Sequence, residues 1–197
     1  MDTPTTTDMK LAPPGAGLPF PESWIARILF RLASCRGNKE SLVARFQNER
    51  DRISALIRVL NTEDLSKRVL IKRPRGLEDS SRNWSILMTL DHLRMVHHGF
   101  KGVIQSLANE QVPNVRISTA AVKPSEQVTE AVVREYEASC DHLLATIASI
   151  QNFNTQAKLA HPWFGPMNAH AWLHLCGLHL KIHRIQIERI LREIRMD

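Results

Sequence analysis

The C-terminal part of the chain, from Trp172 to Glu193, has the hydrophobic pattern of a helix with polar groups on its inner side. Apolar residues recur at steps of three and four positions in two stripes, which is the period of an α-helix. One stripe contains Leu175, Leu178, Ile182 and Ile185, and the other contains Leu173, Leu180, Ile187, Leu191 and Ile194. The line between the stripes contains Trp172, Cys176, His179, His183, Gln186 and Ile190. The opposite face is predicted to be solvated, and it contains His170, His174, Lys181, Arg184, Glu188, Arg192 and Arg195.

His179 and His183 are therefore predicted to point into the protein, where an unpartnered polar side chain costs about 1–3 kcal/mol. They stand four residues apart, so their Cβ atoms lie about 5–6 Å from each other on one helix face and both rings could bind one ion. A third ligand would have to come from a neighbouring helix. The alternative is that both are core histidines, hydrogen-bonded to carbonyl or hydroxyl groups.

The same periodicity predicts five helices and three long connections. We expect helices over residues 21–35, 40–61, 80–107, 125–150 and 166–194, with Ser80 or Ser81 and Ser125 as N-caps and Pro166 or Asn168 opening the last helix. The connections cover residues 62–79, where Val69 to Ile71 form a short β-like run, and residues 109–124 and 151–164. Long connections imply a helical bundle in which neighbours in sequence need not be simply antiparallel.

Further polar residues fall on the inner faces of these helices. In the second long helix, His92 and His97 are both inward, and either could be the third ligand of an ion held by His179 and His183. Tyr136, the only tyrosine, is inward on the third long helix, and its hydroxyl could reach the cavity.

Two other inward residues have simpler interpretations. Glu49 is expected to pair with Arg45 or Arg52 rather than to support a metal-bound histidine. Cys176 is expected to be a small buried residue rather than a ligand.

Length and composition limit the number of domains, the location of the protein and its partners. The 197 residues suit a single domain, predicted here over residues 21–197 after a flexible tail over residues 1–20. Three cysteines on separate helices argue against a disulfide framework. No apolar run approaches the roughly 20 residues that cross a bilayer, and the polar start lacks a basic flank, so we expect a cytoplasmic protein with no membrane contact. The net charge is +6, but the lysines and arginines alternate with acidic residues along the helix faces. This mixed pattern argues against nucleic acid as the partner.

Several motifs together resemble the DinB/YfiT-like superfamily of metal-binding four-helix bundles. These are Trp84-Ser85-Ile86 followed by Asp91-His92-Leu93, then His161-Pro162-Trp163-Phe164-Gly165-Pro166, then His179-x-x-x-His183-x-x-Gln186. The resemblance covers about residues 40–194. It implies an all-α, up-down-down-up bundle, often a homodimer, with a divalent metal held by His92, His179 and His183. The helix before residue 40 and the tail depart from the simplest family pattern.

The expected site is one ion, zinc or nickel first and iron or manganese next, with a coordination position open for a guest molecule. Members of the superfamily with known activity use thiols, which implies a metal-dependent enzyme acting on a small molecule with a low-molecular-weight thiol, by S-transfer or isomerisation. His97 and Tyr136 are the candidates for proton transfer. Two alternatives stay open: a metal-dependent hydrolase, and a non-catalytic metal-binding module for stress response or interaction. A carboxylate-bridged di-iron bundle is disfavoured because the inner faces lack Glu-x-x-His pairs.

Overall fold

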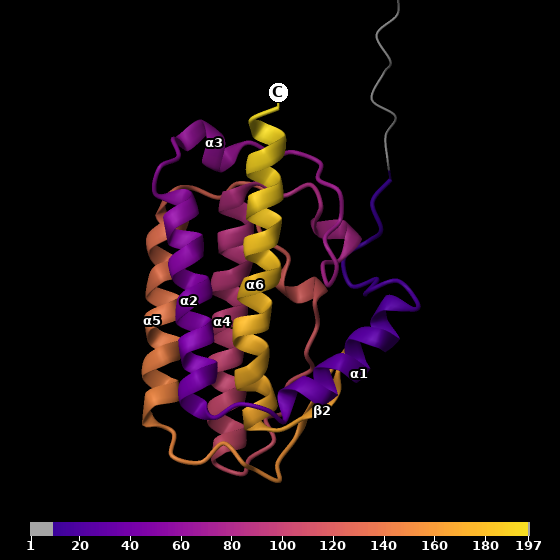
Figure 1. Cartoon of the computed structure of the whole chain (residues 1–197), viewed down its shortest axis with the longest axis vertical. Coiled ribbons are helices and arrows are strands. Elements are labelled where there is room, and N and C mark those ends of the chain that lie inside the picture. Colours follow the sequence, from indigo (N-terminus) through magenta and orange to yellow (C-terminus); the bar gives the residue numbers. More distant parts are fainter. Residues whose placement is uncertain (1–9, 197) are drawn as a thin grey trace, which may run out of the picture.

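Four long helices form the body of the protein (Figure 1). The structure, a computed structural model, describes residues 10–196. The four helices are α2 (Lys39–Ile57), α4 (Ile86–Ala108), α5 (Ala131–Ser149) and α6 (Ala169–Ile194). Their apolar stripes meet in one core that includes Phe46, Leu90, Leu143 and Leu180. The prediction of an all-α four-helix bundle is confirmed.

The helices run up, down, down and up. At the start of α2, the Lys39 ammonium donates to the carbonyls of Ala148 and Ile150, at 3.2 and 2.7 Å, where α5 ends. Near the end of α6, the Gln186 amide donates to the carbonyl of Ser81, just before α4 begins. Helices α4 and α5 are therefore parallel to each other and antiparallel to α2 and α6, as the colour order in Figure 1 also shows. A parallel pair needs a long connection, which explains the segment of residues 109–130.

Polar side chains define where three of these helices begin. Asn38, Ser85 and Asn168 each accept the backbone N–H of the residue three positions later, which satisfies a donor that the first helical turn leaves free. The prediction that Asn168 opens the last helix is confirmed.

Two predicted N-caps are wrong. Ser80 and Ser81 belong to a separate 3-10 turn, η1 (Asp79–Ser81), because Ser85 caps α4 instead. Ser125 caps no helix, since its hydroxyl accepts the N–H of Gln127 in a local turn and its own N–H is held by Asp91. Helix α5 begins only after Glu130, without a side-chain cap.

Short elements fill the connections. They are α3 (Thr62–Ser66), η2 (Ala120–Val122) and an antiparallel pair of strands, β1 (Leu159–His161) and β2 (Gly165–Met167). Val69 to Ile71 are not a strand, because Ile71 makes one backbone bond to Arg82 rather than a ladder. Strand β1 lies in the connection predicted over residues 151–164, whereas Pro166 and Met167 of β2 fall inside the helix predicted from residue 166, so that predicted start is wrong. The strand pair closes where Gly165, with φ of +75°, takes a backbone conformation that glycine adopts readily.

Helix α1 (Glu22–Ser34) lies against the side of the bundle and uses only one of its faces (Figure 1). Its buried residue, Phe30, stacks on Phe164 with ring centroids 4.2 Å apart and meets the edge of His174. The face turned outward is apolar and exposed, with Trp24, Ile25, Ile28, Leu29 and Leu32. The sequence alone does not decide whether this helix is exposed or covers the bundle.

Part of the predicted flexible tail is described by the structure. The N–H of Ala12 donates to Asp79, and the N–H groups of Gly15 and Gly17 donate to Glu78. Residues 10–17 are thus attached beside η1, and the rest of the predicted tail, residues 1–9, lies outside the described residues.

Two residues assigned to the solvated face of α6 are buried. His174 is covered by α1 through Phe30, a contact between distant segments that helical periodicity does not predict. Arg184 is covered because its guanidinium donates to Glu49 of α2 at 2.5 Å and pairs with Glu188 one turn later on α6. Arg52, a predicted partner of Glu49, also forms an ion pair with it, but at a longer distance of 3.8 Å.

The Glu49 to Arg184 pair gives a stability prediction. Replacing Glu49 with alanine leaves a buried guanidinium with Glu188 alone, so Glu49→Ala should lower the free energy of unfolding by about 3 kcal/mol. The control is Asp141→Ala, which removes an exposed partner of Arg50 and should cost about 1 kcal/mol or less. Urea denaturation measures both, and equal losses in the two variants would contradict the prediction.

Candidate metal centre and its cavity

The three predicted metal ligands meet at one point between α4 and α6. The Nε2 atoms of His92 and His183 each lie 3.2 Å from the Nε2 atom of His179. All three ligand atoms lie within 4.8 Å of one another. Among residues 10–196 this is the group of side chains whose placement could hold a metal ion. The structure therefore brings together a histidine triad that could bind metal.

Hydrogen bonds on the outer side of two rings set their orientation. His92 Nδ1 lies 2.7 Å from the carbonyl of Val122, and His183 Nδ1 lies 2.7 Å from the side-chain oxygen of Gln186. The amide nitrogen of Gln186 donates to the carbonyl of Ser81, which directs the amide oxygen toward His183. Because both contacts are to oxygen acceptors, each Nδ1 must carry a proton, and each neutral ring presents its Nε2 lone pair to the other histidines.

This tautomer assignment makes the triad a good match for a cation. His179 Nε2 could donate one proton to one neighbour at most, so at least one pair of rings at 3.2 Å would face each other lone pair to lone pair. A tetrahedral ion bound to nitrogen at about 2.0–2.1 Å separates its ligand atoms by about 3.3 Å. The observed spacing is thus close to the spacing that three imidazoles take around one ion.

Burial keeps the rings neutral. It lowers the pKa of His92 to about 4, and burial followed by the repulsion of neighbouring imidazoles lowers the pKa of His179 and His183 well below the ordinary value. Trp84 contributes to this cover, with its ring parallel to that of His183 and 5.2 Å from that of His92. Neutral imidazole is the form that binds metal, so the triad is ready at neutral pH.

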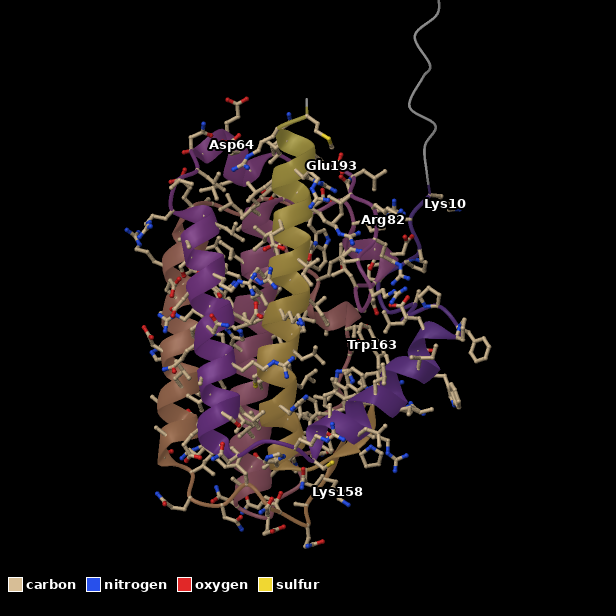
Figure 2. All side chains as sticks on the ribbon, viewed as in Figure 1. Lys10, Asp64, Arg82, Lys158, Trp163 and Glu193 are labelled. Atoms are coloured by element: carbon tan, nitrogen blue, oxygen red, sulfur yellow. The ribbon has the colours of Figure 1, made fainter. Side chains whose placement is uncertain are left out.

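A cavity of about 250 Å³ opens beside the triad, and all three histidines line it. Most of its wall is apolar, from residues of α4, α6, the β1–β2 turn and the connection between α4 and α5. These residues include Trp84, Met95, Val96, Phe100, Val103, Ile117, Val122, Trp163, Phe164, Trp172, Leu175 and Ile182. In Figure 2, Trp163 lies on the side of the bundle that α1 covers, and its carbonyl accepts a hydrogen bond from Arg27 of α1 at 2.8 Å. Parts of the chain outside the four long helices thus close the site.

His161 adds a polar group to the cavity wall that the sequence did not single out as a site residue. Its Nδ1 accepts the backbone N–H of Trp163 at 3.2 Å, so the proton of the neutral ring is on Nε2. Burial lowers the pKa of His161 to about 4, which keeps the ring neutral. His161 is therefore a hydrogen-bond donor on the wall of the cavity.

The two residues predicted to transfer protons lie elsewhere. His97 Nδ1 lies 2.9 Å from the hydroxyl of Ser139 on α5, and its ring is 5.8 Å from that of Tyr136. Neither His97 nor Tyr136 is among the residues that line the cavity, and both are fully buried. Their catalytic role stays a prediction, and their position at the α4–α5 interface argues against it.

The sequence missed residues that hold the triad in place. Gln186 was on the inward line of α6, three residues after His183, and that spacing could have identified it as the acceptor for His183. The carbonyl of Val122 gave no comparable signal, because it comes from a segment predicted as irregular. His161 stood in a motif of the family resemblance, but no role on the cavity wall was assigned to it.

The fold and the site define a four-helix bundle with a buried histidine triad that could bind metal. The sequence matches the DinB superfamily over residues 45–187, which is most of the chain. The protein therefore belongs to the DinB superfamily. Among residues 10–196, none of the helices has the length and apolar character needed to cross a membrane.

Two similar proteins agree with this assignment. The uncharacterized protein YuaE of Bacillus subtilis (strain 168) is 25% identical over 148 residues, covering 61% of this chain and 89% of YuaE. A crystal structure of TT2238, a four-helix bundle protein, superposes with a TM-score of 0.56 and 20% identity, covering 77% of this chain and 98% of TT2238. That structural likeness supports the fold alone.

The support that Gln186 gives to His183 can be measured through metal affinity. Gln186→Leu removes the acceptor that holds the Nδ1 proton of His183, and loss of such a partner weakens metal binding by about 10- to 100-fold. Competition with a chromophoric chelator measures the affinity. The control is Gln105→Leu, the same substitution at an exposed glutamine of α4. Equal affinities of the two variants would show that Gln186 does not orient the ligand.

The burial of His97 predicts a pH dependence of stability. Burial lowers its folded pKa to about 3 from 6.5, so the unfolded chain takes up the proton first as pH falls. Stability that is present above pH 6.5 is then lost toward pH 3, by about 2 kcal/mol between pH 6.5 and pH 5. In His97→Leu this loss should be absent, with the Ser139 hydroxyl still bonded to the Tyr136 carbonyl. Urea denaturation of both metal-free proteins at pH 7 and pH 5 tests this, and parallel losses would refute it.

Proposed function

We propose that this protein is a metal-dependent enzyme that acts on a small molecule with a low-molecular-weight thiol as cosubstrate, by S-transfer or isomerisation. The observation that carries the proposal is the convergence of three Nε2 atoms, 3.2 Å apart in two pairs, on the wall of a cavity. Three neutral nitrogen ligands leave at least one coordination position, which is the arrangement of catalytic rather than structural sites. Imidazole ligands suit zinc and nickel first and also iron.

A bound ion would act as a Lewis acid and would lower the pKa of a thiol that reaches the cavity, so that the thiolate forms near neutral pH. The residues of the chain do the rest. His92, His179 and His183 would hold the ion, and Trp84, Phe100 and Trp172 give the cavity an apolar wall. A thiolate beside an apolar wall is a strong nucleophile toward a small electrophile.

The cysteines of the chain support a thiol that comes from solution. Burial raises the pKa of Cys140 to about 12 and raises that of Cys176 further, so neither forms a thiolate at neutral pH. Cys176 is a small buried residue whose thiol donates to the carbonyl of Trp172. Cys35 is exposed and is not among the cavity residues. A reaction at sulfur in this cavity therefore needs a separate thiol.

Hydrolysis is the second candidate, because the same ion could activate water. The cavity wall provides little help for it. Among residues 10–196, Glu78 is the one carboxylate that lines the cavity, and it already accepts hydrogen bonds from Gly15, Gly17 and Thr119. His161 has its accepting nitrogen occupied by the N–H of Trp163 and so offers no base. A bound ion would lower the pKa of a thiol and of a water alike, with the proton leaving to solvent, so the absence of a free base on the wall counts chiefly against general-base assistance of water attack. A non-catalytic metal-binding module is the third reading, and it predicts metal without turnover.

Metal content tests the foundation of this proposal. Protein purified without a histidine tag should contain close to one equivalent of a divalent transition metal, and His92→Ala and His179→Ala should both lose it, because two imidazoles alone hold an ion weakly. The control is His142→Ala, an exposed histidine on α5. Retention of metal in both triad variants would contradict the assignment of the metal site to these histidines. Thiol use is then tested by product analysis with each candidate thiol omitted in turn. Turnover without any thiol would favour hydrolysis.

A cytoplasmic setting and a homodimer, both expected from the sequence, stay predictions beside this proposal.

A further inference from the structure

The polar groups on the cavity wall differ in how many hydrogen bonds they already make within the protein. The carboxylate of Glu78 is saturated: Oε1 accepts the N–H of Gly17 and the Thr119 hydroxyl, and Oε2 accepts the N–H of Gly15 and the Ser80 hydroxyl. These bonds join three segments of the chain at the edge of the cavity. Glu78 therefore has a structural task and little capacity left to bind a guest cation.

The cationic and donor groups on the same wall are free. Arg116 and Lys123 both line the cavity and are exposed at its edge, on the connection between α4 and α5. Within residues 10–196, neither side chain makes an ion pair or hydrogen bond. His161 adds an Nε2–H donor farther in. Among residues 10–196, the two unpaired cations outnumber the carboxylate of the wall, whose oxygens already accept four donors, so the edge of the cavity attracts negative charge.

The volume and the apolar wall of the cavity indicate the size and polarity of the molecule that it can bind. A volume of about 250 Å³ exceeds the roughly 150 Å³ that holds benzene and falls below the range for drug-sized ligands. The aromatic and aliphatic wall favours an apolar body. The guest is therefore small, apolar along its length and charged at the end that lies near the two cations.

We propose that the cavity binds a small organic carboxylate, with its apolar body against the wall and its carboxylate recognised by Arg116 and Lys123 at the edge. This inference names the substrate class for the function proposed above and rests on it for the chemistry, whereas the recognition of charge depends only on the cavity. Arginine and lysine bind a carboxylate through charge-assisted hydrogen bonds, and such bonds are about twice as strong as neutral ones. The carboxylate could belong to either the electrophile or the thiol.

The test compares an acid with its alcohol on the full-length, zinc-treated protein. 3-Phenylpropanoate and 3-phenylpropan-1-ol share an apolar body and differ in charge, and titration calorimetry at low ionic strength gives both dissociation constants. The acid should bind roughly tenfold or more tightly, because it alone makes charge-assisted bonds. In Arg116→Ala/Lys123→Ala this preference should disappear while the alcohol binds as before. The charge-matched control is Lys158→Ala/Arg192→Ala, two exposed cations outside the cavity wall, and it should keep the preference.

Two results would overturn the inference. One is an acid that binds no more tightly than the alcohol, including the case in which neither binds. The other is a preference that persists in Arg116→Ala/Lys123→Ala, because the carboxylate would then be held elsewhere, for example by the ion. The zinc content of the same samples separates this inference from the proposed function. A zinc-free protein that still prefers the acid would contradict the metal site and support the charge recognition.

Discussion

Two hydrogen bonds behind the histidine rings determine what this site can do. The carbonyl of Val122 holds the Nδ1 proton of His92, and the side chain of Gln186 holds that of His183. These bonds turn two lone pairs toward His179, and the lone pairs oppose one another unless a cation lies among them. Burial then lowers the pKa of all three rings. The rings therefore stay unprotonated at neutral pH, and the repulsion between the facing lone pairs is not relieved by a proton. The geometry and the charge state both favour one ion.

The same bonds connect the site to parts of the chain that lie outside the four long helices. Val122 belongs to η2, in the connection required by the parallel pair α4 and α5, and Gln186 is bonded to Ser81 of η1. Glu78 attaches Gly15 and Gly17 of the N-terminal segment and Thr119 of the connection to the same region. The up-down-down-up order thus gives the bundle long crossings, and these crossings form much of the cavity wall. A simple up-down bundle with short loops would offer the triad no comparable cover.

The helices and the inward position of His179 and His183 could be predicted from a period of 3.6 residues, which left His92 and His97 both open as the third ligand, and the resemblance to the family then implied His92. His92, His179 and His183 fell on inward lines of two helices, and the structure places them together. Local competition between polar residues was harder to predict: Ser80, Ser81 and Ser125 are all plausible caps, and only tertiary contacts show that Ser85 is used and that Asp91 holds Ser125.

Burial by distant segments was not predictable. Arg184 is buried through Glu49, and His174 is buried through α1, whose exposed or covering role the sequence left undecided. The position of His161 on the cavity wall depends on a strand pair only three residues long on each side, too short for a periodic signal. The cavity itself is a product of these tertiary contacts.

X-ray absorption spectroscopy of the zinc-loaded or nickel-loaded protein tests the central claim most directly, since it counts the ligands of the ion without relying on activity. Convergence of the three oriented rings predicts three imidazole nitrogens at about 2.0–2.1 Å from a single ion, with at least one oxygen ligand from water at the remaining position. In a sample without added thiol, a spectrum with fewer than three imidazoles, or with the ion bound through sulfur of the chain, would contradict the account.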